Sequence, residues 1–419
     1  MSQTLDGMRF APERQLIAQL FERFDLESII QHHIESGGVA QVYDWVLGTQ
    51  MRLTPVLAPR LRGMLDEVMR TLGFQEEVQL FVGEKPTVNS FAIHTLGEGQ
   101  PHVISLSSAM VERMSDDELR FVLGHELGHL YFRHYRAFLA YRAFGEDDCG
   151  HSKMPPLLRR RMESWERLSE LTADRAGFLA VGGKLQTVVS AFFRMQSGLG
   201  PEHLRIDIQA FLDQLSDLKK LERRELLSRF SHPVTPIRAR ALQLLQAAGG
   251  ATASAEAMAR VDAEVAELSK LMDFEVTHPL DVHARDFVLA GGLLAASADG
   301  EFSEEERELL IDILLPICAD PEAAAAGIKS ADEAREILGK NAEWLRGNAG
   351  QERFGIFRQL VHIVAVDGHI DDKEKEFVLG AAEMLDIPPK AATEMMFDVL
   401  AGYLQSKAVR KAPTQGFGF

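Results

Sequence analysis

Cysteine and long apolar runs are scarce in this 419-residue sequence. The two cysteines, Cys149 and Cys318, lie far apart in the chain, so no disulfide framework is expected. No stretch of 18 consecutive apolar residues occurs, and the N-terminus lacks the apolar core of a secretory signal. We therefore predict no transmembrane segment and expect a cytoplasmic protein.

Basic residues are outnumbered by acidic ones, 45 against 62, which gives a formal net charge of -17. A nucleic-acid-binding protein needs a basic face that neutralises phosphates, so this balance argues against nucleic acid as a partner. The hydrophobic content of 46% and the charged content of 26% are typical of a globular protein, and the length fits two or three domains.

The strongest chemical signal is the pattern His-Glu-x-x-His at residues 125–129. Ser115 and Glu118 predict a capping box at the start of a helix, and apolar residues then recur at helical spacing. On such a helix His125 and His129 share one face and can bind the same metal, while Glu126 projects beside it. This geometry is typical of zinc peptidases, in which the carboxylate transfers the protons of an activated water. The alternative is two ordinary histidines with an incidental glutamate.

A third metal ligand is not obvious from the motif alone. Phe132 and Tyr135 occupy the positions where the extended His-Glu-x-x-His-x-x-Gly-x-x-His pattern requires glycine and histidine. A carboxylate from a later helix is the remaining common solution. The predicted helix at 162–181 carries Glu170 and Asp174 on one face. Such a pair is usually solvated, but the apolar neighbours favour burial, which would require a cationic partner such as a metal.

Three short β-rich runs, at 78–82, 89–93 and 103–106, predict a small antiparallel sheet, because the turns between them are too short for crossovers. An edge strand beside the metal-bearing helix can bind an extended polypeptide through main-chain hydrogen bonds. The alternative is a purely structural sheet. In the irregular segment that follows the helix, Cys149 is either a thiol that caps the zinc and keeps the enzyme latent or an ordinary cysteine. The residues assigned to substrate binding are Asn89, Ser90, Phe91 and Ala92.

Four ordered motifs resemble the gluzincin family of the HtpX heat-shock proteases and CAAX prenyl endopeptidases, over residues 50–246. They are 89–92, 125–129 followed by Arg133-His134, 170–174, and 231–233 with Arg238. The transmembrane helices of those proteins are absent here, so membrane-embedded or prenylated substrates are not implied.

This resemblance implies a role for individual residues. His125, His129 and Glu170 match the zinc ligands, and Glu126 matches the catalytic base. Asp174 matches a second family acid, which we interpret as accepting a hydrogen bond from a ligand imidazole. His232 matches a family histidine near the cleft; it either stabilises the oxyanion or gates the zinc, or it is a structural turn residue.

The C-terminal region, 258–410, follows an Ala/Gly-rich linker at 247–257 and contains an internal repeat. Its two Asp-Gly pairs begin at Asp299 and Asp367, and Glu306 and Glu374 follow them at matching positions. A calcium EF-hand is excluded because the first and third loop positions carry no carboxylates. These positions are Ala295, Ser297, Ile363 and Ala365.

The doubled Asp-Gly-x-[Phe/Ile]-x-x-x-Glu pattern resembles the TerB-like helical domain of the tellurite-resistance family, over residues 283–405. The resemblance implies that the four acids gather, either as a site for a second divalent cation or as a self-capping acidic cluster. We expect this helical module to recruit a protein partner or to sense a condition.

The predicted fold class is α+β and predominantly helical. A zincin-like peptidase domain with a small antiparallel sheet (50–246) follows a helical extension (1–49), and the linker leads to an all-α TerB-like domain (258–410) and a flexible tail (411–419). We predict an endopeptidase with one Zn²⁺ per chain that hydrolyses polypeptides. The alternative is a latent or regulatory zinc-binding protein, chaperone-like in tellurite or metal stress, with the TerB-like domain as its effector.

Overall fold

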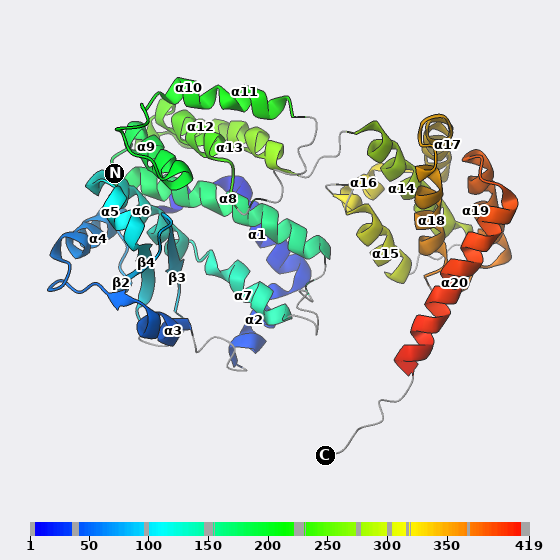
Figure 1. The fold of residues 1–419 in the computed structure, drawn as a ribbon, viewed down its shortest axis with the longest axis horizontal. Helices are drawn as coiled ribbons and strands as arrows, with labels where there is room; N and C mark the ends of the chain where they lie inside the picture. The colour runs from blue at the N-terminus through cyan, green and yellow to red at the C-terminus, as the bar shows by residue number, and fades with distance from the viewer. Residues whose placement is uncertain are drawn as a thin grey trace, which may run out of the picture. The chain divides into compact units, whose positions relative to one another are not determined.

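The computed structural model describes residues 5–35, 42–95, 100–145, 154, 156–221, 230, 232–273, 278–299, 304–315, 318, 320–366 and 369–411. These residues form two compact units (Figure 1). The first runs to Asp273, and the second contains the described residues from His278 onward. Each unit has its own hydrophobic core.

The first unit combines many helices with one small sheet. Its strands are β1 (Met51–Arg52), β2 (Val78–Gly83), β3 (Ser90–Ile93) and β4 (His102–Ser107). Its helices are η1 (Leu5–Met8), α1 (Ala11–Phe24), α2 (Leu26–Glu35), α3 (Val42–Thr49), α4 (Pro59–Leu72), α5 (Ser108–Arg113), α6 (Asp116–Tyr131), α7 (Tyr135–Phe144), α8 (Pro156–Ala180), α9 (Leu185–Ser197), α10 (Ile208–Leu212), α11 (Gln214–Lys219), α12 (Thr235–Ala247), η3 (Gly250–Thr252), α13 (Ala255–Ser269) and η4 (Lys270–Met272).

The sheet has the strand order β1-β2-β4-β3. β3 pairs antiparallel with β4, and β1 pairs antiparallel with β2, but β2 and β4 run parallel. The predicted α+β class is confirmed, whereas the prediction of an antiparallel sheet was wrong for the β2–β4 pair. The chain reverses direction in β3 at the sheet edge, and β4 then inserts between β2 and β3. No separate crossover is needed, because β3 itself is the return path.

Helix α6 begins with the predicted capping box. The Ser115 hydroxyl accepts a hydrogen bond from the Glu118 backbone N–H, and the Glu118 carboxylate accepts one from the Ser115 N–H at 2.7 Å. Ser190 and Arg194 on α9 also bind this buried carboxylate. The start of α6 is therefore fixed both locally and by a neighbouring helix.

Helices α6 and α8 approach each other closely through small residues. A Cβ atom added at Gly128 would lie 2.8 Å from Ala176 Cβ and 3.1 Å from Ala173 Cα. Figure 1 shows α8 between the sheet with α6 on one side and α10 to α13 on the other. This contact brings the histidine face of α6 against the acidic face of α8.

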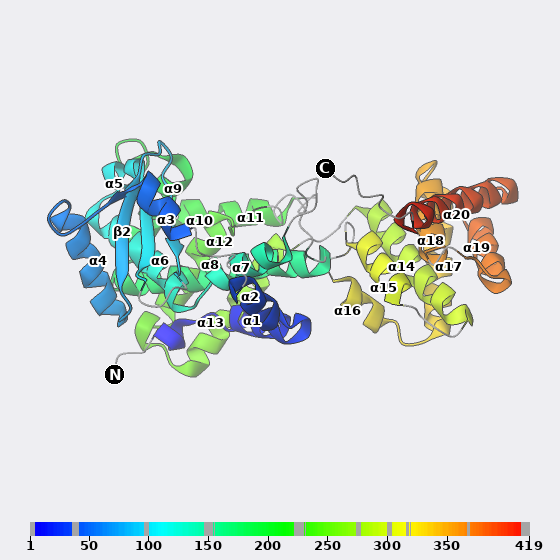
Figure 2. The same ribbon diagram turned by 90° about the horizontal axis from the view of Figure 1, so that it is seen from below.

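The N-terminal helices and α13 belong to the first unit. α1 packs on α8, and α2 packs on α7 (Figure 2). On α13, Asp262 accepts hydrogen bonds from Arg175 Nη2 at 2.6 Å and from the Ala11 backbone N–H at 3.1 Å. The first unit thus continues beyond the segment 247–257, which was predicted as a linker.

The second unit is helical throughout its described part, as predicted for the TerB-like region. Its α14 and α17 pack together; His283 stacks on Trp344 with ring centroids 4.1 Å apart. Along the described chain, no helix combines the length and apolar character needed to cross a membrane. The helices are α14 (Pro279–Asp299), α15 (Glu304–Leu314), α16 (Pro321–Gly327), α17 (Ala331–Asn348), α18 (Glu352–Val364), α19 (Asp372–Met384) and α20 (Pro389–Lys411).

Candidate metal centre

Three side chains converge between α6 and α8. His125 Nε2 lies 3.0 Å from His129 Nε2 and 3.5 Å from Glu170 Oε2, and His129 Nε2 lies 3.2 Å from Glu170 Oε1. Tetrahedral zinc with bonds of roughly 2.0–2.1 Å holds its ligand atoms about 3.3 Å apart. The three atoms therefore have the mutual spacing of a His₂Glu zinc site.

The charges and donors of these groups also fit a divalent cation. Oε2 of Glu170 is buried and has no hydrogen-bond partner among the described residues. Burial alone would raise the pKa of Glu170, but the imidazoles of His125 and His129 hold it well below its usual range. Burial also disfavours charge on His125, yet Asp174 and Glu170 raise the pKa of its imidazole to about 10. The carboxylates thus favour positive charge at the position where a metal would bind.

Asp174 connects the centre to α12. Its Oδ1 lies 3.0 Å from His125 Nδ1, and Arg238 donates to both carboxylate oxygens, at 2.7 Å and 2.6 Å. Burial would raise the pKa of Asp174, but Arg238 and His125 keep it lowered. With its Nδ1–H directed at Asp174, His125 turns Nε2 toward Glu170 and His129, where a metal ion would replace the Nε2 proton. Arg238 stands in one of the four sequence motifs, but its contact with Asp174 was not predicted.

His134 is the corresponding neighbour of His129. Helix α6 ends in a Schellman turn, in which His134 N–H donates to His129 O at 3.0 Å and Arg133 N–H donates to Leu130 O at 3.1 Å. Arg133 occupies the left-handed position of this turn, with φ of 57°. The turn brings His134 Nδ1 to 2.9 Å from His129 Nδ1. Burial and the adjacent His129 hold the pKa of His134 well below its usual range, so this imidazole is neutral.

Glu126 projects beside the ligands toward the sheet edge. Its side chain is 5% exposed, and Oε1 accepts a hydrogen bond from the Ser90 hydroxyl at 2.6 Å. Ser90, Phe91 and Ala92 lie on the edge strand β3, and Asn89 immediately precedes it. The motif at 89–92 therefore lies next to Glu126, and its Ser90 side chain contacts the Glu126 carboxylate.

Of the other predicted residues, the structure places His232 and Glu374. His232 is 60% exposed, and its Nε2 lies 3.6 Å from Glu170 Oε1, so the fold brings it to the metal centre. Cys149, Asp367 and the side chains of Asp299 and Glu306 lie outside the described residues. Glu374 forms a capping box with Asp371: its Oε2 accepts from the Asp371 N–H at 2.6 Å, and Asp371 Oδ1 accepts from the Glu374 N–H at 2.7 Å.

A second group of potential ligands, Glu76, His94 and His102, lies at the other end of β3. The two imidazole rings are tilted by 33° with centroids 4.1 Å apart, and Tyr135 stacks on His94 at 4.0 Å. His102 Nε2 already lies 2.6 Å from Glu76 Oε2. His102 Nδ1 also accepts a hydrogen bond from the Thr95 N–H at 3.3 Å, so both ring nitrogens of His102 have partners within the protein, and we assign no metal to this group.

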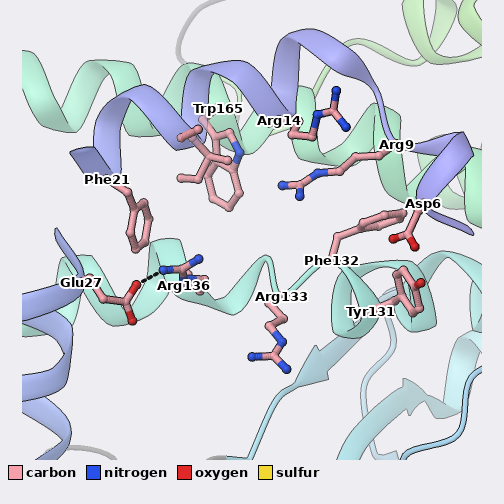
Figure 3. Close-up of a pocket in the computed structure, with 12 residues that line it drawn as sticks. Asp6, Arg9, Arg14, Phe21, Glu27, Tyr131, Phe132, Arg133, Arg136 and Trp165 are labelled. Atoms are coloured by element: carbon pink, nitrogen blue, oxygen red, sulfur yellow. Dashed lines mark hydrogen bonds and ion pairs between the residues drawn. The ribbon is translucent and has the colours of Figure 1, made fainter. Parts of the chain in front are cut away.

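A cavity of about 440 Å³ lies between α1 and the turn that joins α6 to α7. Figure 3 shows Arg9 projecting from the N-terminal segment toward Trp165 of α8, with Phe132 below Arg9 on the side of Tyr131. Arg9 stacks over Phe132 at 5.6 Å. None of the three ligand residues lines this cavity, so it flanks the metal centre and is separate from it.

Comparisons with known proteins agree with this division into two parts. Residues 55–145 match the family model of Peptidase family M48, and residues 285–396 match that of Tellurite resistance protein TerB. Plastoglobule-localized metallopeptidase 48, chloroplastic, from Arabidopsis thaliana is 28% identical over 207 residues, which cover 46% of this chain and 59% of that relative. This chain therefore spans less than two thirds of the relative. No solved structure matched. Both predicted resemblances are confirmed.

Proposed function

Because the chain carries a peptidase family M48 domain in its N-terminal region and a TerB domain in its C-terminal region, we propose that it is a zinc-dependent endopeptidase. The family match supports a metal-dependent protease. The observation that carries the proposal of a zinc site is the convergence of His125, His129 and Glu170 at 3.0 to 3.5 Å beside the buried Glu126.

The proposed ligands hold one Zn²⁺. When bound, zinc supplies the Lewis acidity that activates water for attack on a peptide carbonyl. Glu126 takes up a proton at its carboxylate and returns it to the leaving amine. The Ser90 hydroxyl holds Oε1 of Glu126 in place during both transfers.

We assign substrate binding to the free edge of β3. Asn89 O accepts a hydrogen bond from Ser107 N–H at 2.9 Å, which makes Asn89 and Ser107 a hydrogen-bonded pair. Because hydrogen-bonded and non-hydrogen-bonded pairs alternate in antiparallel strands, the backbone groups of Ser90 and Ala92 point away from β4. The Ser90 N–H already donates to Asn89 Oδ1 at 3.0 Å, so an extended polypeptide added at this edge pairs with the Ser90 carbonyl and with both backbone groups of Ala92. It passes Glu126 with chain continuing in both directions, which suits internal cleavage.

His232 is the proposed stabiliser of the developing negative charge. It is exposed, yet its Nε2 lies beside Glu170, so it is open both to the ligand cluster and to a substrate. An imidazole N–H at this position can donate to the oxygen of the attacked carbonyl. This role requires His232→Ala to reduce turnover without removing the metal.

For the second unit we retain the recruitment of a protein partner as a proposal. The described residues do not support a second cation site, since Glu374 is engaged in its own helix cap. Truncation at Asp273 tests whether cleavage requires this unit.

Zinc content and proteolysis test the proposed function together. We expect one zinc per chain by elemental analysis, cleavage of casein, and loss of both in His129→Ala. His203→Ala, at an exposed histidine of the same unit, is the matched control and keeps both. A zinc-loaded protein that cleaves no unfolded substrate would instead favour the latent zinc-binding alternative.

A further inference from the structure

The N-terminal helix α1 places a carboxylate in the interior beside the metal centre. The side chain of Glu13 is 0% exposed. Arg9 donates to both of its oxygens, at 2.7 Å and 2.9 Å, and Trp165 Nε1 donates to Oε1 at 2.7 Å. Thr172 Oγ1 lies 3.4 Å from Oε2. Residue 13 lies outside the segment 55–145 that matches the peptidase family.

The same carboxylate faces the back of His134. Oε1 of Glu13 lies 3.9 Å from His134 Nε2, which is buried and has no hydrogen-bond partner among the described residues. The opposite nitrogen of His134, Nδ1, lies 2.9 Å from Nδ1 of His129. Glu13, His134 and His129 therefore lie in succession toward a proposed metal ligand, with a hydrogen bond between the two histidines and a longer electrostatic contact of 3.9 Å between Glu13 and His134.

Proton placement along this series is determined by its two ends. If Nε2 of His129 binds the metal, its Nδ1 must carry a proton and donate it to His134 Nδ1. His134 then carries its own proton on Nε2, directed toward the carboxylate. The bidentate pair with Arg9 and the Trp165 N–H give Glu13 the partners that a buried carboxylate requires.

We propose that Glu13 acts through His134 to position His129 as a metal ligand, so that helix α1 is part of the metal centre. This inference rests on the proposed zinc site. Each histidine ligand would then be supported by a carboxylate. Asp174 contacts His125 directly, whereas Glu13 acts on His129 through the imidazole of His134. Both Glu13 and His134 are positioning residues and do not touch the substrate.

The experiment compares zinc affinity and stability in the full-length protein. Zinc affinity is measured by competition with a chromophoric chelator, the ligand field by the visible spectrum of the Co²⁺-loaded protein, and stability by thermal unfolding of the metal-free protein. We expect Glu13→Gln and His134→Leu each to weaken zinc binding by about 10- to 100-fold, the range for outer partners of metal ligands. The double variant should bind no more weakly than His134→Leu alone, because both residues act along one path.

Two further variants separate positioning from a merely structural role. Asp262→Asn removes another buried partner of α1 and of Arg175, but Asp262 has no contact with His134 in the described structure. It should lower the unfolding temperature and leave zinc affinity unchanged. His134→Asn provides an amide oxygen that can accept the His129 Nδ1 proton, so it should retain more zinc affinity than His134→Leu.

Unchanged zinc affinity and an unchanged Co²⁺ spectrum in Glu13→Gln would overturn the proposal, as would additive losses in the double variant. If Glu13→Gln does not fold, equal zinc affinities of His134→Asn and His134→Leu would overturn it equally. A wild-type protein that binds no zinc refutes the proposed metal centre itself, which distinguishes that failure from failure of the Glu13 proposal.

Discussion

The hydroxyl of Ser90 donates a 2.6 Å hydrogen bond to Oε1 of Glu126 and so joins the edge strand of the sheet to the carboxylate of α6. A hydrogen bond to a charged group contributes about 1.5–3 kcal/mol. We therefore expect Ser90→Ala to lower kcat for a casein-derived peptide by about 10- to 100-fold, at unchanged zinc content. Ser90→Thr keeps the hydroxyl and is the matched control. An unaltered kcat in Ser90→Ala would show that Glu126 does not need this contact.

The close approach of α6 and α8 depends on Gly128. Its missing side chain leaves room for Ala173 and Ala176 of α8, and an added Cβ would meet backbone at 3.1 Å. Gly128→Ala should destabilise the protein by about 1–3 kcal/mol and weaken zinc binding, because α8 carries Glu170. The control is Gly63→Ala on α4, where nothing lies within 4 Å and the change should stabilise the helix by about 1 kcal/mol. Equal unfolding temperatures for the two variants would contradict the packing described.

His94, which follows β3 and stacks on Tyr135, makes the stability of the protein sensitive to acid. Burial and the neighbouring His102 lower the pKa of His94 from 6.5 to about 4. Since the folded pKa lies below the unfolded one, the unfolded chain binds the proton more readily. The contribution is present above pH 6.5 and is lost as the pH falls toward 4.

His94→Phe keeps a ring against Tyr135 but cannot titrate. In this variant the unfolding temperature of the metal-free protein should fall less steeply through the same pH window than in the wild type. His203→Gln, an exposed histidine in the same unit, is the control. If the unfolding temperature of His94→Phe falls with pH as steeply as that of the wild type, His94 is not the source of the acid sensitivity.

The boundary of the peptidase unit can be tested by truncation. Arg175 is buried, and its partner Asp262 lies on α13 together with the buried Met258 and Val265. A chain ending at Asp273 should keep zinc and casein cleavage. A chain ending at Ala251 leaves the Arg175 charge buried without its partner, at a cost of about 3–5 kcal/mol, and should lose soluble, active protein. Loss of cleavage by the chain that ends at Asp273 would favour the alternative in which the TerB-like unit is the effector.

Local sequence patterns predicted individual helices and strands better than they predicted which strands pair. The helix at 116–131 follows from its capping residues and apolar spacing, and the metal-ligating pair on it follows from the i, i+4 relation. The parallel pairing of β2 with β4 was missed because strand order is set by which edge the chain returns to, and short turns do not reveal that.

The partners around the ligands were also inaccessible from spacing. Arg238 reaches Asp174 across 64 positions, and Trp165 reaches Glu13 across 152. Nothing in the residues near Glu13 indicates that its side chain is turned inward; its burial depends on helix α8 packing over it. Glu170 was assigned through family resemblance, and the structure adds the distances that make this assignment testable.

The substitution Glu126→Gln tests the central claim most directly, because it removes the proton acceptor while leaving the proposed ligands His125, His129 and Glu170 intact. Zinc content by elemental analysis and casein cleavage are measured on the same preparation. The account predicts one zinc per chain, as in the wild type, and no detectable cleavage. Full cleavage by the zinc-loaded variant would contradict the proposed mechanism.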